Sequence, residues 1–100
     1  MTLSRTDNGV ATILRIVGRL DAETAAELDP IGEDIAAMAQ PRTIILDLTD
    51  LDFIDSAGVS AIVALSRKVR AVGGKVRVAG LRDQPRAICR LLRMDRVLAT

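Results

Sequence analysis

The sequence predicts a single α/β domain built on a mixed sheet of about four or five strands, with helices chiefly on one face. Short β-branched runs alternate twice with segments of helical periodicity, and this order is typical of crossover helices beside a largely parallel sheet. The 100 residues are 49% hydrophobic but only 1% aromatic, which predicts one compact core of aliphatic side chains. We therefore expect one domain spanning residues 1–100.

Three segments have the composition of strands. Residues 10–17 (VATILRIV) and 43–48 (TIILDL) are apolar and rich in β-branched side chains, and residues 75–79 (KVRVA) alternate with period two. Asn8-Gly9 favours a two-residue type I′ turn, which would join residues 3–6 back onto the first of these strands as a hairpin.

The first helix is predicted between the strands at residues 10–17 and 43–48. Its apolar side chains recur at helical spacing at Leu28, Ile31, Ile35 and Met38. Thr24 with Glu27 has the form of a capping box, so Thr24 is the preferred start. Pro30 leaves an alternative open, because an interior proline removes a backbone hydrogen bond: the helix then kinks there or begins at Asp29-Pro30.

The clearest helix covers residues 56–72. Its apolar face is formed by Val59, Ile62, Val63 and Val69. Gly73-Gly74 supplies a left-handed stop before the third strand. Pro85 suits the first turn of a last helix, which carries Ile88, Leu91 and Leu92 and is followed by Val97 and Leu98.

Charge is distributed unevenly along the chain. Residues 1–65 hold 4 basic and 11 acidic residues, a net charge of −7, whereas residues 66–100 hold 10 basic and 2 acidic residues, a net charge of +8. Such separation can give a polar surface that speeds and selects protein encounters, although solvated helix faces are the simpler interpretation.

Several classes of protein are disfavoured by the composition. Charged residues interrupt every apolar run well short of the ~20 residues of a membrane span, so we expect no membrane insertion. No secretory signal is readable at the start, and we expect a cytoplasmic protein. The single Cys89 and the absence of histidine exclude an internal disulfide and the usual zinc and Cys-His catalytic arrangements, so Cys89 is interpreted as a core residue.

The most informative stretch is residues 51–60 (LDFIDSAGVS), which leaves the carboxyl end of the second predicted strand and enters a helix at Ser56. Binding and regulatory sites gather at that edge of a sheet. The simplest role for Ser56 is a helix cap. Ala57 and Gly58, however, are small, so another protein could approach the hydroxyl closely.

A phosphate on Ser56 would add about −1.5 to −2 charges at a helix N-terminus, where the dipole tolerates an anion. Repulsion from Asp55 opposes that gain, so we expect little refolding. The effect of the phosphate should then fall on the surface presented to a partner.

Two runs carry a resemblance to a known family. Asp55-Ser56-Ala57-Gly58 after a strand and Gly18-Arg19-Leu20-Asp21 after an earlier strand resemble the STAS domain family, specifically its stand-alone anti-sigma factor antagonists. The likeness spans nearly the whole chain and includes the Gly73-Gly74 turn and a late pattern of Leu92, Asp95 and Val97.

The resemblance implies a phosphorylation switch. In such proteins the corresponding serine, here Ser56, is phosphorylated by an anti-sigma factor that is itself a serine kinase, and a PP2C-type phosphatase removes the phosphate. The unmodified antagonist binds the anti-sigma factor and so frees the sigma factor. The resemblance places Asp21, Asp55, Ala57 and Gly58 with Ser56 at the partner surface, on a domain that catalyses nothing and needs no cofactor or metal.

Three alternatives remain at the level of sequence. Ala57 stands where many members have Ser or Thr, and the family also contains phosphorylation-independent adaptors such as subunits of lipid-transport ATPases. A magnesium-dependent receiver-type domain would use Asp47, Asp50, Asp52 and Asp55. A nucleic-acid binder would use Arg82, Arg86, Arg90, Arg93 and Arg96, but aromatic platforms for bases are missing, and we expect no direct contact with nucleic acid.

Overall fold

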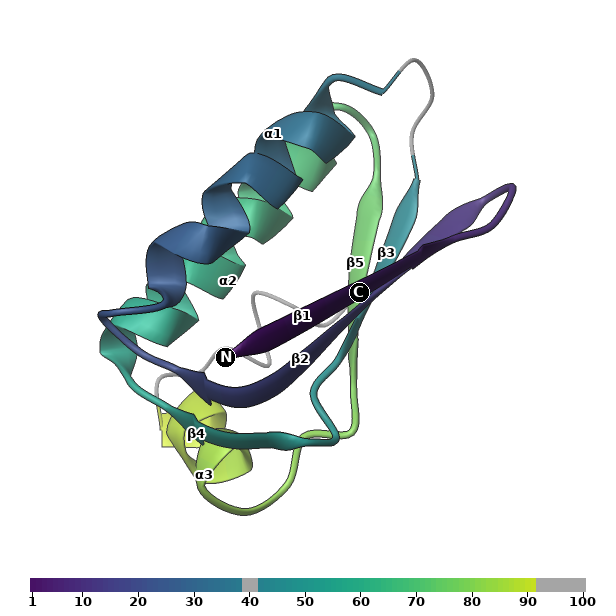
Figure 1. The fold of residues 1–100 in the computed structure, drawn as a ribbon. Coiled ribbons are helices and arrows are strands. Elements are labelled where there is room, and N and C mark those ends of the chain that lie inside the picture. The colour runs from purple at the N-terminus through teal and green to yellow at the C-terminus, as the bar shows by residue number, and fades with distance from the viewer. Residues whose placement is uncertain (39–41, 92–100) are drawn as a thin grey trace.

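The computed structural model describes residues 1–38 and 42–91. Within them, five strands form a mixed sheet: β1 (Thr2–Asp7), β2 (Ala11–Leu20), β3 (Thr43–Asp47), β4 (Leu51–Ile54) and β5 (Lys75–Ala79). The helical elements are the 3-10 helix η1 (Ala25–Leu28), α1 (Asp29–Ala36), α2 (Ser56–Ala71) and α3 (Asp83–Leu91). Figure 1 shows α1 and α2 side by side over one face of the sheet, with α3 beside β4. The predicted fold class is confirmed.

β2 organises the sheet. β1 pairs with it antiparallel, whereas β3 and β4 both pair with it in parallel, β3 along Ala11–Arg15 and β4 along Gly18–Leu20. A register shift between Gly18 and Arg19 interrupts the pairing of β2 with β4. β5 lies parallel to β3. Because β2 and β4 run the same way, the loops that follow them leave from the same edge of the sheet.

The structure contains a strand that the sequence interpretation missed. Residues 51–54 were interpreted as part of a connection to the helix, but they form β4. The segment is only four residues long and is interrupted by the exposed Asp52, so its strand character is weak locally and depends on its pairing with distant β2.

The predicted N-terminal hairpin is confirmed, but its turn type was wrong. Neither Asn8 nor Gly9 has a positive φ, which a type I′ turn requires at both positions. Instead the Asn8 side-chain oxygen accepts hydrogen bonds from the backbone N–H groups of Val10 and Ala11, at 3.0 and 2.8 Å.

The α-helix of the first helical segment begins at Asp29, with Pro30 in its first turn, which was the alternative start. Thr24 precedes only the short helix η1 and makes no side-chain cap, so the capping box with Glu27 was wrong. The Thr24 hydroxyl instead donates to the Arg19 carbonyl and accepts from the Asp21 N–H, both at 3.0 Å, and so holds the loop after β2.

The second and third helices lie close to their predicted positions. α2 begins at Ser56 and ends at Ala71, and Gly73 takes the left-handed conformation with φ 85°. α3 begins at Asp83, two residues before Pro85, and Cys89 is buried in the core as expected. The predictions for Leu92, Val97 and Leu98 lie outside the described residues.

The core lies between the sheet and the α1/α2 layer. β2 buries alternate side chains, as the period of a strand requires. Those that are completely buried include Leu14 and Ile16 from β2, Ile44 and Leu46 from β3, and Ile62 and Val69 from α2. This packing fixes the start of α2 against the end of β2.

Candidate functional site

The candidate site is built from two neighbouring chain turns, one after β2 and one between β4 and α2. The Asp55 N–H donates to the Leu20 carbonyl at 3.3 Å, and the Ala22 N–H donates to Asp55 Oδ2 at 3.2 Å. These bonds join the turn that carries Asp21 to the turn that carries Ser56. The structure therefore brings the two turns together, as the family resemblance implied.

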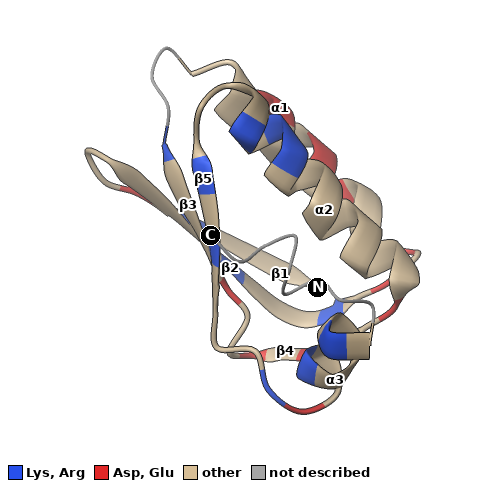
Figure 2. Cartoon of the chain, turned by 180° about the vertical axis from the view of Figure 1, so that it is seen from behind, with Lys and Arg blue, Asp and Glu red and all other residues tan. Residues whose placement is uncertain are grey.

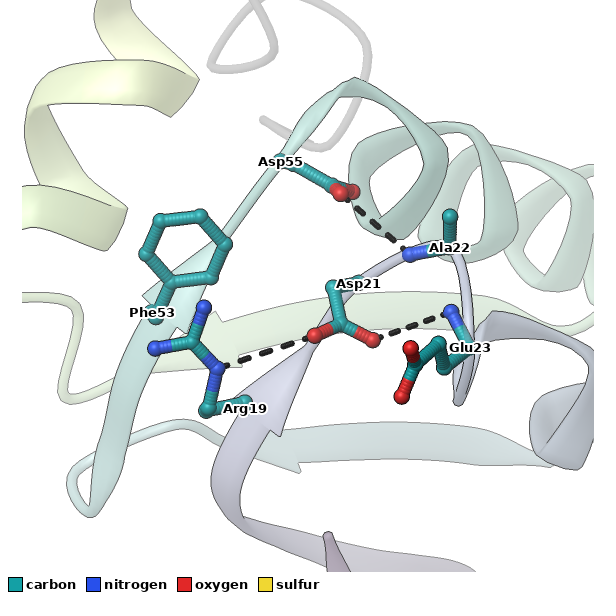
Figure 3. Close-up of a pocket in the computed structure, with 6 residues that line it drawn as sticks. All are labelled: Arg19, Asp21, Ala22, Glu23, Phe53 and Asp55. Carbon is teal, nitrogen blue, oxygen red and sulfur yellow. Dashed lines mark hydrogen bonds and ion pairs between the residues drawn. The ribbon is translucent and has the colours of Figure 1, made fainter.

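Asp55, rather than Ser56, caps α2. Its backbone is extended, with φ −115° and ψ −174°, and its Oδ1 accepts a hydrogen bond from the Gly58 N–H at 2.9 Å. The suggestion that Ser56 is the cap was wrong, because the cap lies one residue earlier. Asp55 thus has two roles. One carboxylate oxygen caps the start of α2, and the other accepts from the Ala22 N–H and holds the loop after β2 (Figure 3).

Ser56 is the first residue of α2 and is exposed to solvent. Within the described part of the chain, no group makes a hydrogen bond with its hydroxyl. The hydroxyl is therefore neither used by the fold nor hidden by it. The hydroxyl of a serine that caps a helix accepts a hydrogen bond from a backbone N–H of the first turn.

Ala57 and Gly58 differ in their surroundings. Ala57 is partly buried, whereas Gly58 is buried, and a Cβ at position 58 would overlap the Leu20 carbonyl oxygen and press on the Ile54 side chain. The glycine lets the start of α2 approach the end of β2. A side chain at position 58 would therefore need space inside the molecule rather than at its surface.

An open pocket of about 450 Å³ lies beside Asp55. It is lined by Arg19, Asp21, Ala22, Glu23, Phe53 and Asp55, which Figure 3 shows converging from the ends of β2 and β4. The Arg19 guanidinium lies over the Phe53 ring, 4.1 Å from its centroid, and its Nε is 3.6 Å from Asp21 Oδ2. Arg19 and Phe53 were not predicted as site residues, although Phe53 is the one aromatic residue of the sequence.

Asp21 is held as a charged group. Partial burial by itself raises the pKa of the Asp21 carboxyl, but hydrogen bonds from Glu23 and Thr24 and the charge of Arg19 outweigh it, so the pKa lies below its ordinary value. The Glu23 N–H donates to Asp21 Oδ1 at 3.0 Å. Asp21 therefore presents a fixed negative charge at neutral pH.

Gln84, from α3, contacts the same junction and was not predicted. Its Oε1 accepts from the Ile54 N–H at 3.0 Å and its Nε2 donates to the Ile54 carbonyl at 2.8 Å. Nothing local in the sequence indicates this pair of bonds, because residues 54 and 84 meet only in the folded chain.

The aspartates of the receiver-type alternative have separate local roles. Asp47 accepts from the Thr49 N–H and hydroxyl, and these bonds lower the pKa of its carboxyl. Asp50 pairs with Arg15 and Arg82, and Asp52 is exposed on β4. Across residues 1–38 and 42–91, no three His, Cys, Asp or Glu side chains are grouped so that they could hold a metal ion.

The charge asymmetry of the sequence is visible in the fold. Figure 2 shows acidic residues along α1 and basic residues on the second half of α2, on β5 and on α3. Arg82 donates to the Thr49 carbonyl at 2.9 Å, while Arg86 and Arg90 are exposed. Arg93 and Arg96 of the nucleic-acid alternative lie outside the described residues.

Residues 3–100 match the STAS domain family, and the chain belongs to this family. This confirms the family that the runs at residues 18–21 and 55–58 resemble. Among the described helices, none has the length and apolar character needed to cross a membrane.

Curated relatives with a similar sequence are named as anti-sigma factor antagonists. The chain is 40% identical over 63 residues to the anti-sigma-F factor antagonist RsfB of Mycobacterium tuberculosis, a match that covers 62% of this chain and 49% of RsfB. The chain spans about half the length of the curated relatives it matches.

Solved structures share the fold at lower identity. An anti-sigma factor antagonist from Mycobacterium paratuberculosis has a TM-score of 0.79 at 21% identity, covering 98% of this chain and 82% of that one. Unphosphorylated SpoIIAA has a TM-score of 0.72 at 22% identity, covering 99% and 100%. The phosphorylated form of Bacillus SpoIIAA has a TM-score of 0.73 at 20% identity, covering 91% and 83%.

Proposed function

We propose that this chain is a cytoplasmic anti-sigma factor antagonist controlled by phosphorylation of Ser56. In the unphosphorylated form it binds an anti-sigma factor that is a serine kinase, and the sigma factor is released. The kinase phosphorylates Ser56 and ends the binding, and a PP2C-type phosphatase restores it. The domain supplies the substrate serine and the binding surface and performs no catalysis of its own.

The observation that carries this proposal is the state of the Ser56 hydroxyl, which is exposed and has no hydrogen-bond partner among the described residues. A kinase could reach it without opening the fold. Support also comes from RsfB, which is named as an anti-sigma-F factor antagonist, and from SpoIIAA, which is known in unphosphorylated and phosphorylated forms.

A phosphate on Ser56 would act on the partner rather than on the fold. Asp55 already occupies the Gly58 N–H, so a phosphate finds no vacant cap at that donor, although the dipole of α2 still favours an anion there. It would add about −1.5 to −2 charges close to Asp55. A partner that accommodates the neutral hydroxyl then meets a bulky anion, and about 3 kcal/mol of lost contact weakens binding roughly a hundredfold.

The binding affinity of serine variants tests the proposal. We expect Ser56→Ala to bind the anti-sigma kinase as tightly as the wild type and to stay bound when ATP is present. Ser56→Asp should fold normally and bind at least tenfold more weakly by titration calorimetry. Ser4→Asp is the matched control, since it adds the same charge to an exposed serine of β1. Equal affinities of Ser56→Ala and Ser56→Asp would reject the switch and favour a phosphorylation-independent adaptor.

A further inference from the structure

The outer side of β4 is completed by a side chain instead of another strand. β4 pairs with β2 on one side, and α3 lies next to it (Figure 1). At Ile54, both backbone polar groups that point away from β2 bond to the Gln84 amide, at 3.0 and 2.8 Å. A primary amide offers a donor and an acceptor side by side, as the backbone of a neighbouring strand does.

These bonds act on the peptide unit just before the site. The carbonyl of the Ile54–Asp55 peptide accepts from Gln84 Nε2, and the N–H of the same peptide donates to the Leu20 carbonyl at 3.3 Å. The peptide plane is thus held from both sides, by α3 and by β2. Since this plane fixes the start of the Asp55 backbone, it sets the direction in which the chain enters Ser56.

We propose that Gln84 is a positioning residue for Ser56, which holds the Ile54–Asp55 peptide so that the serine is presented for phosphoryl transfer. This inference rests on the proposed function. In the transfer, Ser56 Oγ forms a bond to the γ-phosphorus of ATP held by the kinase, the bond to the bridging oxygen breaks, ADP leaves, and the hydroxyl proton passes to a base of the kinase.

The size of the effect follows from the geometry of phosphoryl transfer. Catalysis by a kinase depends mainly on placing the nucleophile in line with the leaving group, and a displacement of about 1 Å can cost a hundredfold in rate. Loss of one of the two supports of the peptide should displace Ser56 by less than this. We expect a fall of about tenfold in kcat, which corresponds to about 1.4 kcal/mol.

Three variants test the role of Gln84. Gln84→Ala removes both bonds, and Gln84→Glu keeps an acceptor for the Ile54 N–H but, when ionised, cannot donate to the Ile54 carbonyl. Arg86→Ala is the matched control, because Arg86 is an exposed residue of the same helix. Circular dichroism spectra check that every variant has the secondary structure of the wild type before it is compared.

Hydrogen exchange and kinase turnover are measured on each variant. In Gln84→Ala, amide exchange at Ile54 should be at least tenfold faster than in the wild type, and kcat for phosphorylation at saturating protein should fall about tenfold, while Arg86→Ala changes neither. In Gln84→Glu, lowering the pH protonates the carboxyl and restores a donor, so the amide signals of Ile54 and Asp55 should return toward their wild-type positions.

Two different failures can be distinguished. If wild-type protein is phosphorylated but Gln84→Ala has unchanged kcat, the positioning role is overturned and the proposed function stands. If wild-type protein is not phosphorylated by any anti-sigma kinase of its organism, the proposed function and the role of Gln84 in transfer are both overturned.

Discussion

At the scale of single residues, the site depends on how polar groups are divided between structure and surface. The Asp55 carboxylate accepts hydrogen bonds from a backbone N–H in the first turn of α2 and from one in the loop after β2. The neighbouring Ser56 hydroxyl is therefore not needed for either. Had Ser56 been the cap, its phosphorylation would have altered the group that caps the helix. Because the cap lies one residue earlier, a modification of Ser56 would leave the capping group in place.

The double role of Asp55 can be separated by mutation. We predict that Asp55→Ala lowers the free energy of unfolding by about 1–2 kcal/mol, because it removes the cap. Asp55→Asn should cost less, since asparagine is an equally good cap and loses only the bond from Ala22. Urea unfolding measures both values, and an Asp55→Ala variant as stable as the wild type would contradict the assignment of the cap.

Ser66 offers a second test at this scale. Its side chain is completely buried in α2, and its hydroxyl has no hydrogen-bond partner among residues 1–38 and 42–91. A buried unsatisfied hydroxyl costs about 1–3 kcal/mol. We predict that Ser66→Ala raises the free energy of unfolding by up to about 1 kcal/mol, less than that cost because a small cavity is left. If urea unfolding instead shows that Ser66→Ala lowers the free energy of unfolding by more than about 1 kcal/mol, the hydroxyl makes a hydrogen bond in solution.

At the scale of elements, the site depends on the close approach of α2 to the end of β2. Gly58 permits this approach, because its neighbour is the Leu20 carbonyl. The same carbonyl accepts a hydrogen bond from the Asp55 N–H. The Leu20 carbonyl therefore contacts both the start of α2 and the residue that caps it.

Adding a methyl group at this contact should be costly. Alanine usually favours a helix over glycine by about 1 kcal/mol, but here we predict that overpacking outweighs this gain and that Gly58→Ala lowers the free energy of unfolding by about 1–3 kcal/mol. Gly9→Ala is the control, because nothing lies within 4 Å of the added atom. Equal stability of the two variants in chemical unfolding would refute the tight packing of α2 on β2.

The elements also show where sequence reasoning succeeds. β2, β3, β5 and α2 carry their own periodicity, and Ser56 could be placed before a helix from the chain alone. β4 and Gln84 could not be predicted, since each is defined by a partner about 30 residues away. The choice between Asp55 and Ser56 as cap was also open, because both residue types are favoured caps and the register of the first turn depends on packing.

At the scale of the whole molecule, paired carboxylates link stability to pH. The pKa values of Asp7, Asp21 and Asp47 are all lowered in the fold from the model-compound value of 3.8. For Asp7 and Asp47 the largest cause is a hydrogen bond from a threonine hydroxyl, Thr12 and Thr49 respectively. The unfolded chain therefore binds more protons than the folded one in the acid range.

The sign of the pH dependence follows from this difference. Stability contributed by these carboxylates is fully present above their unfolded pKa and is lost as pH falls through the folded pKa. We predict a thermal midpoint that is steady between about pH 7 and 5 and falls below about pH 4. Asp47→Asn should show a smaller fall. A midpoint that rises on acidification below pH 4 would contradict the lowered pKa values.

The phosphorylation of Ser56 is tested most directly by intact mass. The protein is incubated with ATP and each candidate anti-sigma kinase of its own organism, and any modified residue is mapped by fragmentation. The switch predicts a gain of about 80 Da, one phosphate, on Ser56 and no gain in Ser56→Ala. An unchanged wild-type mass with every such kinase, or a phosphate on a different residue, would contradict it.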